Sequence, residues 1–230
     1  MSNTISVIVP CYNEEKRILP IIKSLKLSRS IIEIIVVDDG SDKKSQKILS
    51  HLSGIKLITH PQNLGKAKAL YRGLLASRGN IVVFVDSDLI GFTPRHLQLL
   101  VNPIIKHGYD LTIGDIECIL FPFKLSGYSA CYSGERAYRS RILKKYPQIF
   151  SAGGYVDGFL VEAEMNRLFF GKYKIAKVLL DGVGAHYKIC KYGISGFLND
   201  FKVMKHCLNY LGIKEELKQL KFIRSINYLK

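Results

Sequence analysis

The chain has 230 residues, of which 47% are hydrophobic and 23% are charged, and its formal net charge at pH 7 is +15. This is the composition of a globular protein with a sizeable core, and no uncharged apolar stretch reaches the ~18–20 residues of a membrane-spanning helix. The basic excess is strongest in residues 171–230 and favours an anionic partner: nucleic acid, a phosphorylated substrate or a membrane surface.

Short apolar runs alternate with amphipathic segments through the first 115 residues. The runs are continuous and rich in β-branched residues, which is typical of strands buried on both faces of a sheet. They predict strands at residues 5–9, 32–37, 55–59, 81–85 and 109–113. Apolar residues at helical spacing lie between them, and this alternation predicts a mostly parallel α/β sheet with helices on both faces.

Local signals indicate where these helices begin. Asn13 is a candidate cap for the first helix, whose regular part is expected to begin near residue 18 because Pro20 fits badly deep inside a helix. Thr93-Pro94 is a good helix start, with a cap followed by a first-turn proline. The helix before the fourth strand carries apolar residues at helical spacing: Ala67, Leu70, Leu74 and Leu75.

The pattern loosens between residues 115 and 195, where aromatic and glycine-rich loops surround a predicted helix near 159–170 and a strand at 175–180. Residues 196–230 have the pattern of two amphipathic helices. The last is expected to place its apolar residues on one side: Ile213, Leu217, Leu220, Ile223 and Ile226.

Acidic pairs follow two of the predicted strands, Asp38-Asp39 after the second and Asp86-Ser87-Asp88 after the fourth. Residues i and i+2 of an extended chain point the same way, so Asp86 and Asp88 should project together from the edge where open α/β sheets bind ligands. Two carboxylates repel each other, and a divalent cation that carries phosphates would relieve the repulsion. A turn with two solvated aspartates is the alternative.

Other nucleotide-binding motifs fit poorly. The first strand is followed by Cys11-Tyr12-Asn13-Glu14 instead of a G-x-G-x-x-G fingerprint, and Gly65-Lys66 lacks the hydroxyl residue and upstream glycine of a P-loop. A nucleotidyltransferase would share the sheet and the metal aspartates, but it should have a glycine-rich loop after the first strand. A dehydrogenase or a P-loop NTPase fits these motifs less well than a nucleotidyltransferase does.

Four segments in order resemble the signature of family-2 glycosyltransferases with the GT-A fold: residues 9–14 (VPCYNE), 37–41 (VDDGS), 63–66 (NLGK) and 86–88 (DSD). Residues 133–139 (SGERAYR) are similar to a segment of polyprenyl-phosphate sugar synthases. Residues 182–187 (GVGAHY) resemble the segment of glucosyl-phosphoglycerate and mannosylglycerate synthases in which a histidine completes metal coordination.

The resemblance implies a GT-A nucleotide-sugar transferase that uses Mg²⁺ or Mn²⁺. The implied metal ligands are Asp86, Asp88 and His186. The implied nucleotide-binding residues are Pro10, Tyr12, Glu14, Asp39, Gly65, Lys66, Asp86 and Ser87. Asp88, Glu135 and Arg136 are the catalytic candidates, with Arg136 and Arg139 available to hold an acceptor phosphate.

Glu162 and Glu164 are further candidate bases, but residues two apart on a helix cannot face the same point, so at most one should reach the site.

The expected reaction is hexosyl transfer from a UDP- or GDP-sugar. The favoured acceptor is a polyprenyl or other lipid phosphate, because basic amphipathic C-terminal helices could lie on anionic lipid. A soluble phosphorylated acceptor such as a glycerate is the alternative. Nucleic-acid binding through the basic tail is remote, since the acidic strand ends suit a sugar nucleotide better than a polyanion.

The resemblance also suggests a domain division. Residues 1–195 are expected to form the transferase domain, with a nucleotide-sugar half at 1–115 and an acceptor half at 116–195, and residues 196–230 a basic helical extension. The five cysteines are far apart without a C-x-x-C pair, and no basic leader precedes the first apolar run. We therefore expect reduced thiols and a cytoplasmic protein that could lie at the inner face of the membrane or form a homodimer.

Overall fold

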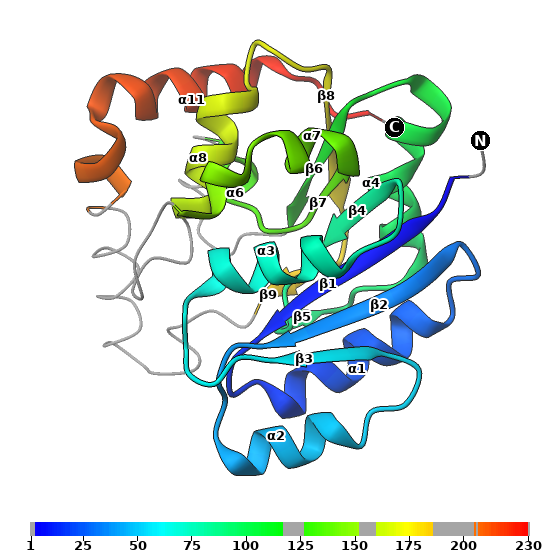
Figure 1. Ribbon diagram of the computed structural model, residues 1–230. Coiled ribbons are helices and arrows are strands. Elements are labelled where there is room, and N and C mark those ends of the chain that lie inside the picture. Colours follow the sequence, from blue (N-terminus) through cyan, green and yellow to red (C-terminus); the bar gives the residue numbers. More distant parts are fainter. Residues whose placement is uncertain (1–2, 117–126, 152–159, 186–204, 206, 230) are drawn as a thin grey trace.

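The computed structural model describes residues 3–116, 127–151, 160–185, 205 and 207–229. Its centre is a seven-stranded sheet in the order β3-β2-β1-β4-β7-β6-β8 (Figure 1). The strands are β1 (Ile5–Cys11), β2 (Ile31–Asp38), β3 (Lys56–Thr59), β4 (Ile81–Phe84), β6 (Leu111–Ile116), β7 (Arg136–Arg139) and β8 (Ile175–Leu180). Only β7 runs antiparallel to its neighbours within this sheet. A second, two-stranded sheet pairs β5 (Leu89–Ile90) with β9 (Gly184–Ala185).

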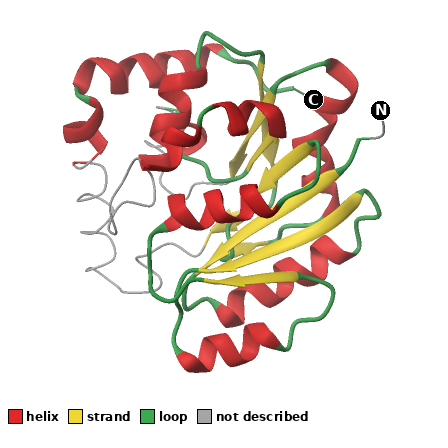
Figure 2. Ribbon diagram, viewed as in Figure 1, coloured by secondary structure: helices red, strands yellow, loops and turns green. Residues whose placement is uncertain are grey.

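Helices cover both faces of the large sheet (Figure 2). One face packs against α1 (Glu15–Lys26), α2 (Lys43–Ser50) and α4 (Pro94–His107). The other packs against α3 (Lys66–Ala76), α6 (Tyr128–Cys131), α7 (Ser140–Lys145), the 3₁₀ helix η1 (Pro147–Ser151), α8 (Leu160–Phe169) and α11 (Ile213–Ser225). Apolar residues on alternate sides of each strand thus divide the core into two layers, and the predicted α/β class is confirmed.

The start of α1 differs from the prediction. The helix begins at Glu15 and contains Pro20, which costs it one internal hydrogen bond, while Ile18, Ile21 and other apolar residues still bury one face. Asn13 does not cap it. Its φ of +53° is in the left-handed region, and its side-chain oxygen accepts a hydrogen bond from the backbone N–H of Asp42 at 2.9 Å.

Two predicted helix faces are also corrected. On α3, Leu75 is 57% exposed, and Gly73 lies on the buried face instead. On α11, Ile213 and Leu217 are 68% and 60% exposed, whereas the polar residues Glu216 and Gln219 are buried with Ile223. The apolar face predicted for the last helix is therefore right only in part, because Leu220, Ile223 and Ile226 pack on the core and the other two residues do not.

The C-terminal segment is fastened to the rest of the molecule. The side-chain amide of Gln219 donates a hydrogen bond to the carbonyl of Ala163 on α8 at 3.2 Å. Tyr228 forms a bridge with Lys177 at the edge strand β8 and donates a hydrogen bond to Asp115 on β6. Within the described ranges, none of the helices has the length and apolar character that crossing a bilayer requires.

Candidate active site at the carboxyl ends of the strands

The loops that follow β1, β2 and β4 lie close together at the carboxyl ends of these strands, because the three strands are parallel. The first two loops are tied together: the backbone N–H of Asn13 donates to the Ser41 hydroxyl at 2.9 Å, and the N–H of Asp39 to the Cys11 carbonyl at 2.8 Å. Tyr12, between them in the first loop, is exposed. A partly exposed aromatic side chain at this edge is available to a ligand.

Lys66, the first residue of α3, is the cation at the centre of the site. Its Nζ lies 2.8 Å from Oδ1 of Asp86 and 2.9 Å from Oε1 of Glu162 on α8. Burial disfavours the charged ammonium, but the carboxylates of Asp86 and Glu162 outweigh that cost and hold the pKa of Lys66 above its ordinary value. The ammonium therefore stays charged between these two carboxylates.

Glu135 adds a third carboxyl group. It is fully buried; one oxygen accepts a hydrogen bond from the Ser133 hydroxyl at 2.8 Å, and the other has no hydrogen-bond partner among the described residues. Burial, with the nearby negative charge of Asp86, raises the pKa of Glu135 to about 8. Burial also raises the pKa of Glu162, against the opposing charge of Lys66. Three carboxyl groups thus surround one ammonium, so the cluster favours a further positive charge or a proton.

Gly134 allows this cluster to be compact. A Cβ atom at that position would lie 2.6 Å from Oδ2 of Asp86 and 2.7 Å from Nζ of Lys66. Because both distances are shorter than any normal contact, no other residue fits without moving the ion pair.

Glu162 and Glu164 face different surroundings, as their spacing on a helix predicted. Glu162 contacts Lys66 in the site, whereas Glu164 pairs with Arg167 at 2.8 Å. The sequence prediction that at most one of them reaches the site is confirmed.

The two arginines predicted to hold an acceptor phosphate lie at opposite ends of β7. Arg136 is buried and donates hydrogen bonds to the carbonyls of Ser133 and Cys131 and to the side-chain oxygen of Asn166, at 2.7, 2.7 and 2.8 Å. Arg139 pairs in register with Ile81, the first residue of β4, and therefore lies at the amino end of β4, away from the site. Phosphate binding by Arg136 stays a prediction, and its contacts are those of a residue that holds the turn before β7 to α8.

Asp39 connects the end of β2 to the loop before α3. Its Oδ1 accepts hydrogen bonds from Nδ1 of His60 at 2.8 Å and from the N–H of Leu64 at 3.0 Å, and its Oδ2 accepts from the N–H of Gly65 at 2.8 Å. Gly65 has φ +92° and ψ 155°, a conformation that only glycine adopts readily. Asp39 thereby fixes the turn that delivers Lys66. His60 was not among the predicted site residues, although its place directly after β3 was a usable signal.

The predicted metal ligands fit a hard cation where the structure describes them. Asp86 and Asp88 are both partly exposed after β4, and carboxylate oxygens suit Mg²⁺ or Mn²⁺. His186 lies outside the described residues. The described chain reaches Ala185, which pairs with Leu89, the residue after Asp88. Among the described residues, no cluster of three metal-binding side chains is present.

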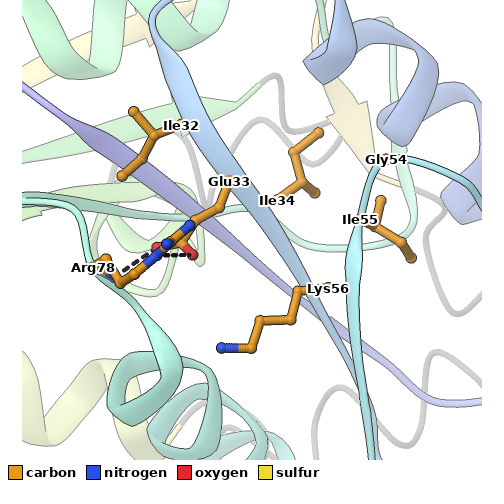
Figure 3. Close-up of a pocket in the computed structure, with 7 residues that line it drawn as sticks. All are labelled: Ile32, Glu33, Ile34, Gly54, Ile55, Lys56 and Arg78. Atoms are coloured by element: carbon orange, nitrogen blue, oxygen red, sulfur yellow. Dashed lines mark hydrogen bonds and ion pairs between the residues drawn. The ribbon is translucent and has the colours of Figure 1, made fainter.

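A separate pocket lies at the amino ends of β2 and β3, away from the strand ends that carry the candidate site (Figure 3). It has a volume of about 330 Å³ and is lined by the amino end of β2, residues 54–56 and Arg78. Glu33 in its wall is already paired with Arg78. None of the predicted site residues lines this pocket.

The family model described as "Glycosyl transferase family 2" matches residues 6–162. Among curated proteins, glucosyl-3-phosphoglycerate synthase of Mycolicibacterium paratuberculosis is 40% identical over 111 residues, which are 44% of this chain and 33% of that protein. Dolichyl-phosphate beta-glucosyltransferase of Dictyostelium discoideum is 37% identical over 99 residues, 36% of this chain and 30% of that protein. These alignments span about a third of the length of the relatives.

Solved structures match over more of the chain. Glucosyl-3-phosphoglycerate synthase of Mycobacterium tuberculosis, in complex with Mn²⁺, uridine diphosphate and phosphoglyceric acid, superposes with a TM-score of 0.69 at 26% identity, covering 98% of this chain and 80% of that one. A structure of the same enzyme with Mg²⁺ and uridine diphosphate gives a TM-score of 0.63 at 27% identity, covering 85% of this chain and 78% of that one.

Proposed function

This chain belongs to glycosyl transferase family 2, and we propose that it transfers a sugar from a uridine-diphosphate donor to a small phosphorylated acceptor, with Mn²⁺ or Mg²⁺ as cofactor. The observation that carries the proposal is the contact of Lys66 with Asp86 at the carboxyl end of β4, beside Asp88. The donor, acceptor and metal are taken from the solved relative, which binds uridine diphosphate and phosphoglyceric acid with Mn²⁺.

The residues would share the work as follows. Asp86 and Asp88 would hold the cation together with the donor diphosphate, and the cation, when bound, supplies a Lewis acid for the leaving group. The Lys66 ammonium would donate hydrogen bonds to the diphosphate while Glu162 keeps it oriented. A proton on Glu135, whose pKa is raised to about 8 by burial and the charge of Asp86, would limit the negative charge beside the diphosphate. Pro10, Tyr12, Glu14 and Asp39 would surround the nucleoside.

The lipid-phosphate acceptor favoured by the sequence is less well supported. Glucosyl-3-phosphoglycerate synthases match longer stretches of the chain than the dolichyl-phosphate transferase does. Part of the apolar face expected to lie on lipid is also packed inside the protein, because Leu220, Ile223 and Ile226 contact the core. The dolichyl-phosphate relative keeps a lipid phosphate as the second candidate. A membrane surface, a homodimer, the cytoplasmic location and the domain boundaries stay predictions.

A panel of acceptors distinguishes these possibilities. Purified protein would be incubated with UDP-glucose and Mn²⁺, with 3-phosphoglycerate, glycerol 3-phosphate or detergent-dispersed polyprenyl phosphate, and products identified by mass spectrometry. A hexosyl-phosphoglycerate product supports the proposal, and a hexosyl lipid phosphate alone replaces the acceptor. If no sugar moves to any acceptor, from UDP-glucose or from a GDP-sugar, the proposed activity is wrong.

A further inference from the structure

His60 fixes the carboxylate of Asp39 in one orientation. A carboxylate can only accept hydrogen bonds, so the Nδ1 of His60, at 2.8 Å from Oδ1, must carry the hydrogen. His60 is itself buried, and its backbone N–H donates to the carbonyl of Asp38 at 2.8 Å. Neither partner can turn without losing a buried hydrogen bond.

The loop around Asp39 leaves no room for another arrangement. A Cβ atom at Gly40 would lie 2.2 Å from the carbonyl carbon of Gln62, so the turn after β2 packs directly against the backbone of the next loop. On the other side of the Asp39 carboxylate, the backbone N–H of Gly65 donates a hydrogen bond to Oδ2 at 2.8 Å. The Asp39 side chain is only 5% exposed, which leaves a narrow approach for any ligand.

The acceptor capacity that remains on Asp39 can be counted. Each carboxylate oxygen has two lone pairs. Those of Oδ1 are used by His60 and Leu64, and one of those of Oδ2 is used by Gly65. Asp39 can therefore accept one further hydrogen bond, on Oδ2.

We propose that His60 is a specificity-determining residue of the nucleobase site, because it restricts Asp39 to a base that donates a single hydrogen bond. This inference rests on the proposed function, in which Asp39 contacts the base. Uracil presents one donor, N3–H, between two carbonyl acceptors, and Oδ2 of Asp39 can receive it. Guanine presents two adjacent donors, N1–H and the 2-amino group, which pair best with both oxygens of a carboxylate.

The occupied oxygen also favours uracil for an electrostatic reason. A carboxylate oxygen without partners would repel a carbonyl oxygen of uracil lying next to N3–H. Hydrogen bonds from His60 and Leu64 disperse the charge of Oδ1, so that repulsion is reduced. Removal of the His60 ring would restore a free lone pair on Oδ1, which weakens the fit to uracil and improves the fit to guanine.

The test compares dissociation constants of UDP and GDP, measured calorimetrically with Mn²⁺, for the wild type and three variants. His60→Ala removes the donor, and the preference for UDP over GDP should fall about tenfold. His60→Asn places an amide N–H where Nδ1 was, and the preference should return to that of the wild type. His51→Ala, an exposed histidine on the neighbouring helix end, is the matched control and should change neither constant.

A purely structural role for His60 would weaken both nucleotides by the same factor in His60→Ala, which would overturn the inference while leaving the proposed function intact. An unchanged preference in His60→Ala would do the same. If His60→Ala does not fold, a preference in His60→Asn about tenfold below that of the wild type overturns the inference. Absence of metal-dependent nucleotide binding by the wild type contradicts the proposed function and the inference together.

Discussion

The Lys66 ammonium, at the first residue of α3, lies 2.9 Å from Oε1 of Glu162 on α8. This contact joins the part of the chain that carries the NLGK and DSD motifs to the part that follows β7. Glu162 is buried, and its second carboxylate oxygen has no hydrogen-bond partner in the part of the chain that the structure describes. We infer that Glu162 orients Lys66 toward Asp86.

Glu162→Gln should lower kcat by about tenfold or more, because a neutral amide holds the Lys66 ammonium less firmly than a carboxylate does. The matched control is Glu164→Gln on the same helix, where the partner is Arg167 at the surface. Steady-state kinetics with UDP-glucose measure both. An equal loss of kcat in the two variants would mean that the Lys66 contact has no special importance.

Glu135 should make stability depend on pH. Its folded pKa of about 8 lies above the ordinary carboxyl value, so the folded state binds a proton that the unfolded state has already lost between about pH 4.5 and pH 8. Stability should therefore fall as pH rises through this window, by up to about 1.4 kcal/mol per pH unit. Urea unfolding at pH 5, 6, 7 and 8 measures the slope. Glu135→Gln, which mimics the protonated acid, should make the slope shallower, and an identical slope in the variant rules out Glu135 as a source.

Gly134→Ala should separate Asp86 from Lys66, since its methyl group would lie 2.6 Å from Oδ2 of Asp86 and 2.7 Å from Nζ of Lys66. We expect nucleotide affinity to fall about tenfold or more, with the loss of a charge-assisted contact to the diphosphate. Calorimetric titration of UDP with Mn²⁺ tests this, and circular dichroism checks that the variant is folded. A folded variant with wild-type affinity would contradict the geometry of the site.

The C-terminal helix offers a matched pair of substitutions. Ile223→Ala removes a buried side chain and should cost about 2–5 kcal/mol of unfolding free energy. Leu217→Ala, at an exposed position of the same helix, should stay within about 0.5 kcal/mol. Denaturant unfolding of both variants measures the difference. Equal effects would show that α11 does not pack as described.

The elements that could be predicted from the sequence have contiguous patterns. The β-branched runs of β1, β2 and β4 and the acidic residues after them are local signals, and the Thr93-Pro94 start of α4 is another. β7 was missed because it has only four residues, two of them arginines. Its backbone pairs with β4 and β6, and Arg136 can be buried in it because carbonyl and amide oxygens accept hydrogen bonds from the guanidinium.

The partners within the site were harder to predict, because they come from distant segments. Nothing near Lys66 in the sequence points to Glu162, and nothing near Asp39 points to His60 as the residue that orients it. The face of α11 was predicted only in part for a related reason: Gln219 is buried where its side-chain amide donates a hydrogen bond to a carbonyl of α8. Hydrophobic periodicity cannot predict that a polar residue is buried when its hydrogen-bond partner comes from a distant segment.

We expect Asp88 to help hold a cation on a uridine-diphosphate donor, and the most direct test is the rate of UDP release from UDP-glucose in the presence of 3-phosphoglycerate. With the wild type, UDP release should require Mn²⁺ or Mg²⁺, should stop with EDTA, and should fall about a hundredfold or more in Asp88→Asn. Acceptor-dependent UDP release that continues at the same rate in EDTA, or in Asp88→Asn, would contradict this role of Asp88 and the cation.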